Sequence, residues 1–150
     1  MSEENLNEEL NEDPTPTPEP TPTTEPTYDA VNSILNSVKK ALGLEPSYTP
    51  FDDEIIMHIN TVLSILNQLG VGVLGFTITD GASTWADFLA NETAKGITVN
   101  EVKTYVAKRV QILFDPPTSG IYMDALKNVI SELEFRINVA VETPIREGIS

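Results

Sequence analysis

The chain has 150 residues, of which 40% are apolar, so it can bury one modest hydrophobic core and a single domain is expected. It contains no cysteine, which excludes disulfides, Cys-ligated zinc and a thiol nucleophile, and which suits a reducing compartment. The formal net charge of −14 argues against general affinity for nucleic acid, because that affinity comes from cations that neutralise phosphates. With no apolar run of about 18 residues and no signal-peptide pattern, we expect a soluble protein without a membrane partner.

The negative charge is concentrated in residues 1–27, which hold eight Asp and Glu side chains and no Lys or Arg. Thr-Pro steps fill the stretch from Pro14 to Pro26, and only Leu6 and Leu10 are available for burial. Such a segment cannot offset the entropy lost on ordering, so this acidic tail is expected to be disordered. Two roles stay open for it: a solvated leader that limits aggregation, and a tether or docking segment.

From Tyr28 onward, apolar residues recur at intervals of three and four, which is the spacing of an amphipathic helix. The first predicted helix ends at Gly43, and a proline-containing connector follows it. The acidic run at residues 52–54 then places negative charge at the start of a second helix, which ends at Gly70. The apolar stripes are Val31, Ile34, Leu35, Val38 and Leu42 in the first helix and Ile55, Ile59, Val62, Leu63, Leu66 and Leu69 in the second.

Two capping-box patterns mark the next helix starts, Thr84 with Asp87 and Thr98 with Glu101. The first predicts a short third helix, and the second predicts a fourth that must end near Phe114, because a residue before proline avoids the helical region. A fifth helix follows the Pro-Pro-Thr-Ser-Gly corner at residues 116–120. The predicted buried residues are Trp85, Phe88 and Leu89 in the third helix, Val102, Tyr105, Val106, Val110 and Leu113 in the fourth, and Leu126, Val129, Ile130, Leu133 and Ile137 in the fifth.

The Pro-Pro-Thr-Ser-Gly corner is short and rigid, so it forces the fourth and fifth helices into an antiparallel hairpin. The predicted fold class is therefore all-α. We expect a small bundle of about five helices with this long antiparallel helical hairpin, one extended loop at residues 71–83, and a disordered acidic N-terminal tail.

The extended loop begins with GVGVLG at residues 70–75, which matches the dinucleotide fingerprint GxGxxG by letter. That fingerprint works between a strand and a following helix, whereas here a helix precedes the glycines, so we do not expect nucleotide binding. Val71, Val73, Phe76 and Ile78 suit a loop that contacts a neighbouring subunit. A loop folded onto its own domain is the alternative, and both stay open.

Residues that carry catalytic or metal chemistry are scarce. His58 is the only histidine, and its spacing suggests no partner, so a surface or half-buried structural histidine is expected. The carboxylates at residues 52–54 are interpreted as helix-start charges rather than as ligands of a hard cation. We therefore predict no catalytic, cofactor-binding or metal-binding residue, no cofactor and no enzyme activity.

The densest basic cluster is Lys103, Lys108 and Arg109 on the fourth predicted helix. A solvated helix face is one interpretation. The other is a subunit contact in which these cations meet carboxylates of a neighbouring copy. The carboxylates considered for that contact are Asp52, Asp53 and Asp124.

Five stretches together resemble the head-tail connector, or adaptor, proteins of tailed bacteriophages. They are ILNSVKKALG at 34–43, FDDEIIMHIN at 51–60, LNQLGVG at 66–72, KRVQILFDPP at 108–117 and ELEFRIN at 132–138. The resemblance spans about residues 33–142, and the order and spacing of the stretches make it specific. The acidic tail lies outside it.

The resemblance implies a structural component of the virion neck, assembled in the host cytoplasm. In that family a dodecameric ring sits beneath the portal protein, joins it to the stopper or tail completion protein, and encloses a channel through which DNA passes without specific binding. It also implies that the C-terminal stretch, with Val141, Ile145 and Ile149, docks on the portal. The expected division is an acidic tail at 1–27, a helical connector domain at 28–142 and a docking tail at 143–150.

The net charge also supports a second function class. An acidic helical protein can act as a DNA mimic or as a regulator of a basic partner. The charge of −14 is the only sequence feature in favour of that alternative.

Overall fold

The computed structural model describes residues 32–90 and 97–142, and within these ranges it contains five helices and no strand. They are α1 (Ile34–Ala41), α2 (Asp52–Gln68), α3 (Trp85–Phe88), α4 (Val99–Phe114) and α5 (Gly120–Glu142). The predicted all-α fold is confirmed. The acidic tail at residues 1–27 lies outside the described residues.

Local sequence signals set most of the helix ends. Both capping boxes form, since the Thr84 and Thr98 hydroxyls accept hydrogen bonds from the third backbone N–H of α3 and α4 and the acidic side chains there bond back. Helix α1 begins one residue after Ser33, whose hydroxyl accepts from the Asn36 N–H at 3.2 Å. Helix α4 ends at Phe114, as the prolines after it require.

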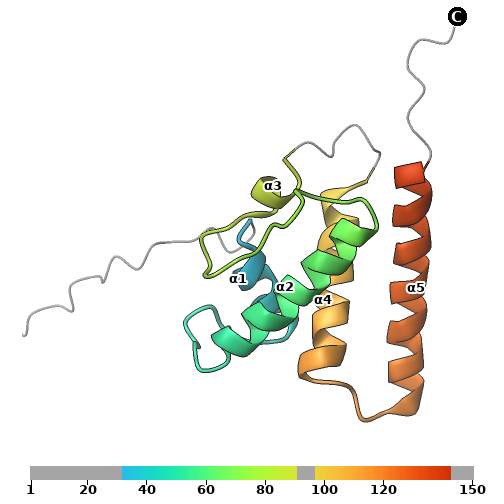
Figure 1. Cartoon of the computed structure of the whole chain (residues 1–150). Coiled ribbons are helices and arrows are strands. Elements are labelled where there is room, and N and C mark those ends of the chain that lie inside the picture. The colour runs from blue at the N-terminus through green and yellow to red at the C-terminus, as the bar shows by residue number, and fades with distance from the viewer. Residues whose placement is uncertain (1–31, 91–96, 143–150) are drawn as a thin grey trace, which may run out of the picture.

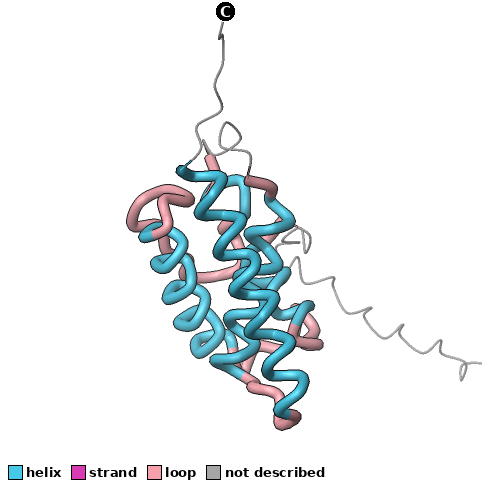
Figure 2. The backbone as a smooth tube through the Cα atoms, turned by 90° about the vertical axis from the view of Figure 1, so that its right-hand side faces the viewer, coloured by secondary structure: helices cyan, strands magenta, loops and turns pink. Residues whose placement is uncertain are grey.

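Helix α4 is the centre of the bundle, because α1, α2 and α5 all pack against it. In Figure 1, α2 crosses α4 obliquely, while α5 runs alongside α4 at one edge of the molecule. Figure 2 views the molecule from that edge and shows α5 in front of the other helices. One side of α5 therefore faces the core, and the other faces outward.

The core is built from the apolar stripes of α1, α2 and α4, closed by the residues between α2 and α4 and by one side of α5. Of the residues predicted to be buried, Leu113 and Val129 are instead exposed: Leu113 lies in the last turn of α4, beyond Val110, and Val129 lies at the border of the buried stripe of α5. Val31 lies outside the described residues. The largest wholly buried side chains include Tyr105, Lys39, Phe88, Ile59, Leu63 and Ile137.

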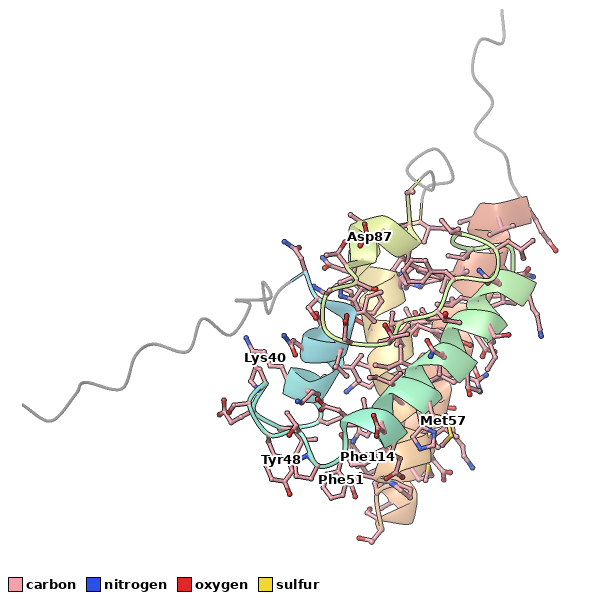
Figure 3. All side chains as sticks on the ribbon, turned by 60° about the vertical axis from the view of Figure 1, so that its left-hand side comes forward. Lys40, Tyr48, Phe51, Met57, Asp87 and Phe114 are labelled. Atoms are coloured by element: carbon pink, nitrogen blue, oxygen red, sulfur yellow. The ribbon has the colours of Figure 1, made fainter. Side chains whose placement is uncertain are left out.

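The corner at residues 115–119 joins α4 to α5 as an antiparallel hairpin (Figure 1). Ser119 starts α5, since its hydroxyl accepts from the Tyr122 N–H at 3.3 Å and its carbonyl from the Met123 N–H at 2.9 Å. On the other side of the corner, the Phe114 ring packs edge-on against Phe51 with 5.3 Å between centroids, and both side chains meet at the base of the bundle in Figure 3. The corner is thus held to the start of α2.

A buried ion pair ties α1 to the start of α2. Lys39 is wholly buried, its ammonium lies 2.7 Å from Asp52 Oδ1, and it donates a hydrogen bond to the Pro46 carbonyl at 2.9 Å. A buried ammonium is costly without such partners. Asp52 therefore has two roles, as a helix-start charge and as the counter-ion of Lys39.

The loop after α2 is folded onto its own domain by two asparagines of that helix. Asn60 exchanges two hydrogen bonds with the backbone of Ile78, at 2.8 and 3.0 Å. Asn67 donates to the carbonyls of Val71 and Val73 and accepts from the Gly75 N–H. These amides replace the backbone partners that an irregular segment lacks.

We predict that Asp52→Asn lowers the free energy of unfolding by about 2 kcal/mol, because Lys39 stays buried without a counter-charge. The neighbouring substitution Asp53→Asn is the matched control. It removes only an exposed charge at the helix start and costs about 0.5 kcal/mol. Urea unfolding of both variants measures the difference, and equal losses would show that the Lys39–Asp52 pair does not stabilise the fold.

Gly72→Ala should be strongly destabilising, since φ at Gly72 is +84° and a Cβ there would lie 2.2 Å from Cζ of Phe88. We expect a loss of about 3 kcal/mol from the clash and the backbone strain together. At Gly75 φ is also positive, but a Cβ would meet open space, so Gly75→Ala should cost about 1 kcal/mol. Thermal unfolding of the two variants tests this, and equal shifts in Tm would contradict the packing of Phe88 on Gly72.

Candidate functional site

The outward side of α5 carries apolar residues that the bundle does not cover. Ile121 is 85% exposed and Phe135 is 69% exposed, and Val129 and Val139 are also exposed. With Ala125 these residues recur at intervals of four or six residues. Ile121, Phe135 and Val139 lie on the side opposite the buried Leu126, Ile130 and Ile137, and Val129 lies between the two sides. We call Ile121, Ala125, Val129, Phe135 and Val139 the α5 outer face.

A single exposed apolar residue is ordinary, but several along one helix mark a contact surface. Polar side chains interrupt the α5 outer face, notably Glu132 and Arg136, whose carboxylate and guanidinium lie 2.7 Å apart. The apolar pattern of this helix predicts its core stripe, whereas the second apolar face was not predicted from the sequence. The spacing of Ile121, Phe135 and Val139 off that stripe was the available signal.

A polar network between α4 and α5 holds the outer face in position. The Tyr105 hydroxyl donates to Glu134 Oε1 at 2.8 Å, and the Arg109 guanidinium forms a hydrogen-bonded ion pair with the same carboxylate. Arg109 Nε also donates to the Tyr105 hydroxyl at 3.2 Å, and the guanidinium lies 5.6 Å from the centre of the Tyr105 ring. These contacts fix the rotation of α5 about its own axis relative to α4.

The pKa shifts in this network keep Tyr105 protonated and Glu134 ionised at neutral pH, as a structural link between two helices requires. Burial and the hydrogen bond to Glu134 raise the pKa of Tyr105 to about 12. Burial alone would raise the pKa of Glu134, but the hydrogen bonds from Arg109 and Tyr105 outweigh it, so that pKa lies below its usual value. Both pKa values move away from neutrality, whereas a general acid or base works best with a pKa near the working pH.

The predicted contact residues of the loop divide into two groups. Val71 and Ile78 are buried in the core, and Phe76 is half-buried with its ring 5.4 Å from that of Phe88. Val73 is 42% exposed and remains available for a contact. Its neighbour Leu74, which the sequence analysis did not include, is 87% exposed.

The basic cluster on α4 is also divided. The Arg109 guanidinium forms an ion pair with Glu134 of its own chain and is therefore already engaged. Lys108 is half-buried on another side of α4, where it lines a shallow groove together with Lys103. His58 is half-buried beside Glu54, with 3.7 Å between Nε2 and Oε1.

Of the three predicted portal-docking residues, Val141 belongs to the last turn of α5 and packs against the core near Gly70. Ile145 and Ile149 lie outside the described residues.

The described ranges, residues 32–90 and 97–142, hold no helix with the length and apolarity to cross a membrane. They also hold no group of three or more His, Asp or Glu side chains placed to bind a metal ion.

The fold is a small helical bundle with an uncovered apolar helix face, a kind of surface suited to contact with other proteins. The family is more specific: residues 34–144 match the model of the phage connector proteins, and the chain belongs to that family. This is a structural family rather than an enzyme family, so the chain is a virion component that associates with other phage head or tail proteins. Neither a curated protein nor a solved structure matched the chain.

The pKa of Tyr105 makes the α4–α5 link sensitive to alkaline pH. Below pH 10 the phenol is protonated in both the folded and the unfolded chain. Between about pH 10 and about pH 12 the unfolded chain loses this proton first, so the free energy of unfolding falls by about 1–2 kcal/mol across that window. In the Tyr105→Phe variant, the free energy of unfolding should not show this part of its fall with rising pH.

The matched control is Tyr122→Phe, which changes an exposed tyrosine at the start of α5. Urea unfolding at several pH values measures all three proteins. A Tyr105→Phe variant that declines as steeply as the native chain would contradict a structural role for the buried hydroxyl.

Proposed function

We propose that the chain is the structural head-tail connector of a tailed phage. In this proposal it forms a dodecameric ring beneath the portal protein, links the head to the stopper or tail completion protein, and surrounds the DNA channel in the virion neck. Assembly takes place in the host cytoplasm. Membership of the phage connector family supports the general role, and the arguments below support the finer assignments.

The observation that carries the ring is the α5 outer face. Its apolar side chains recur along a helix of 23 residues, a length of about 34 Å. Covering this face with a neighbouring subunit removes Ile121 and Phe135 from water, which favours association. The Tyr105–Glu134 link keeps the face in one orientation before assembly, so little ordering is needed on contact.

A head-to-tail ring also requires a second, different patch on each subunit. Exposed apolar side chains of the α1–α2 connector provide a candidate, namely Tyr48 and Phe51. In Figure 1 this connector lies on the far side of α4 from α5, and Figure 3 shows Tyr48 and Phe51 together at the base. The two rings are 5.8 Å apart between centroids.

The charge distribution suits a channel through which DNA slides. The formal net charge is −14, and three cations of the described residues are held by carboxylates of the same chain: Lys39, Arg109 and Arg136. Cations engaged in this way are poorly available to phosphates. A negative lining would repel the duplex rather than bind it.

The portal contact is assigned to the chain that follows α5. Val141 is engaged in the core, so the docking stretch begins after Glu142 and includes Ile145 and Ile149. Isoleucines in a short segment suit addition to a groove or a strand edge of a partner.

Phe135→Ser and Ile121→Ser test the ring. Each side chain is exposed in the monomer, so we expect unfolding free energies within about 0.5 kcal/mol of native. Assembly on the purified portal, measured by light scattering and electron microscopy, should fall at least tenfold, because each variant removes an anchor from the contact. Val99→Ser is the control, since Val99 is 47% exposed at the start of α4 and lies off the α5 outer face.

Unchanged assembly of both α5 variants would exclude this face as the subunit contact. A native chain that stays monomeric with the portal, and that competes with DNA for a basic enzyme in a salt-sensitive way, would favour the DNA mimic instead.

A further inference from the structure

A shallow groove of about 250 Å³ runs between α1 and α4, on a different side of α4 from the α5 hairpin. Its apolar floor consists of Val38, Ala41, Trp85 and Ala107. The indole N–H of Trp85 donates to Ser37 Oγ at 3.0 Å, which fixes one wall. We call this depression the α1–α4 groove.

Two lysines of α4 flank the groove. Lys103 and Lys108 line it together with Thr104, and none of the lining residues is acidic. Lys40 is exposed on α1 next to Ala41 and can be seen projecting from that helix in Figure 3. In a chain with a net charge of −14, this side of the bundle is unusually rich in positive charge beside apolar surface.

We propose that the α1–α4 groove binds the acidic Thr-Pro segment that precedes α1 in the same chain. The inference does not depend on the ring proposed above. It is carried by three features: the charges of the two partners, the place where the segment enters the bundle, and the chemistry of the groove floor.

The charges are complementary. Residues 1–31 hold nine carboxylates and no Lys or Arg, and Glu25 and Asp29 are the nearest of them to α1. Pro26 and Tyr28 lie between these two carboxylates. The stretch Glu-Pro-Thr-Tyr-Asp thus combines two carboxylates with apolar groups, as the groove lining combines two lysines with apolar side chains.

The segment also enters the bundle at the groove. The Asn32 carbonyl accepts a hydrogen bond from the Trp85 N–H at 3.0 Å, so the chain reaches α1 beside a residue of the groove floor. Residues 25–31 span up to about 23 Å when extended, whereas the eight residues of α1 span about 12 Å. The stretch is long enough to turn back along the whole groove.

Binding within one chain needs little intrinsic affinity, because the short connection gives a high effective concentration. Proline-rich segments also lose little entropy when they dock against aromatic and apolar surface. Exposed ion pairs are weak and screened by salt, so the bound state should open as the ionic strength rises.

Paramagnetic relaxation in the full chain tests the proposal, since the absence of native cysteine allows a single spin label at Thr24→Cys. We expect several-fold stronger broadening of the amides of Ala41 and of residues 103–108 than of those of Asn128 and Glu132 on α5. Raising NaCl to about 1 M, where the Debye length is about 3 Å, should remove most of this difference.

Charge variants locate the contact. The double variant Glu25→Gln with Asp29→Asn leaves the described bundle untouched and should reduce the broadening several-fold, as should Lys103→Gln with Lys108→Gln. Lys127→Gln, an exposed lysine on α5, is the control and should change nothing.

Broadening of equal strength over the whole surface would overturn the proposal. Broadening that is the same in the Glu25→Gln, Asp29→Asn variant as in the native chain would also overturn it. A second sample mixes a spin-labelled chain without ¹⁵N with a ¹⁵N chain that carries no spin label. It shows whether the segment in the groove belongs to the same chain or to a neighbouring chain. Broadening in that mixture would assign the groove to a neighbour's segment and contradict binding within one chain.

Discussion

The packing of α4 against three other helices is the constraint on which the remaining structure depends. Its stripe of Val102, Tyr105, Val106 and Val110 is wholly buried, so α4 cannot rotate without exposing the core. The Tyr105 hydroxyl extends from this stripe to Glu134 and so transmits the fixed position of α4 to α5. The rigid corner at residues 115–119 does the same at the other end of the hairpin. One face of α5 is therefore directed away from the core.

Local signals in the sequence predicted the elements of the fold well. Capping boxes at Thr84 and Thr98, the charges at the start of α2 and the prolines after Phe114 each act within a few residues, so their outcome depends little on the rest of the chain. Contacts between distant residues were not predictable in this way. Tyr105 and Glu134 are 29 positions apart, and nothing in their local patterns shows that they meet.

The loop residues predicted as contacts differ in their burial. Val73 is exposed, whereas Val71 and Ile78 lie in the core, because Asn60 and Asn67 bind the backbone of the loop to α2. A polar residue within a helix gives no sign of which backbone it will bind. The outer face of α5 is a second apolar pattern in the sequence of that helix. It was not predicted as a surface, because the core stripe alone was enough to predict the helix.

The α4–α5 hairpin carries two different surfaces. Helix α4 supplies the two lysines of the α1–α4 groove, and helix α5 supplies the apolar outer face. We propose that the α5 outer face holds this connector to a neighbouring subunit in the virion neck. Electron cryo-microscopy of the intact neck tests this contact. We expect Ile121 and Phe135 to be buried against a neighbouring chain, and an α5 outer face that meets solvent in the assembled particle would contradict the proposal.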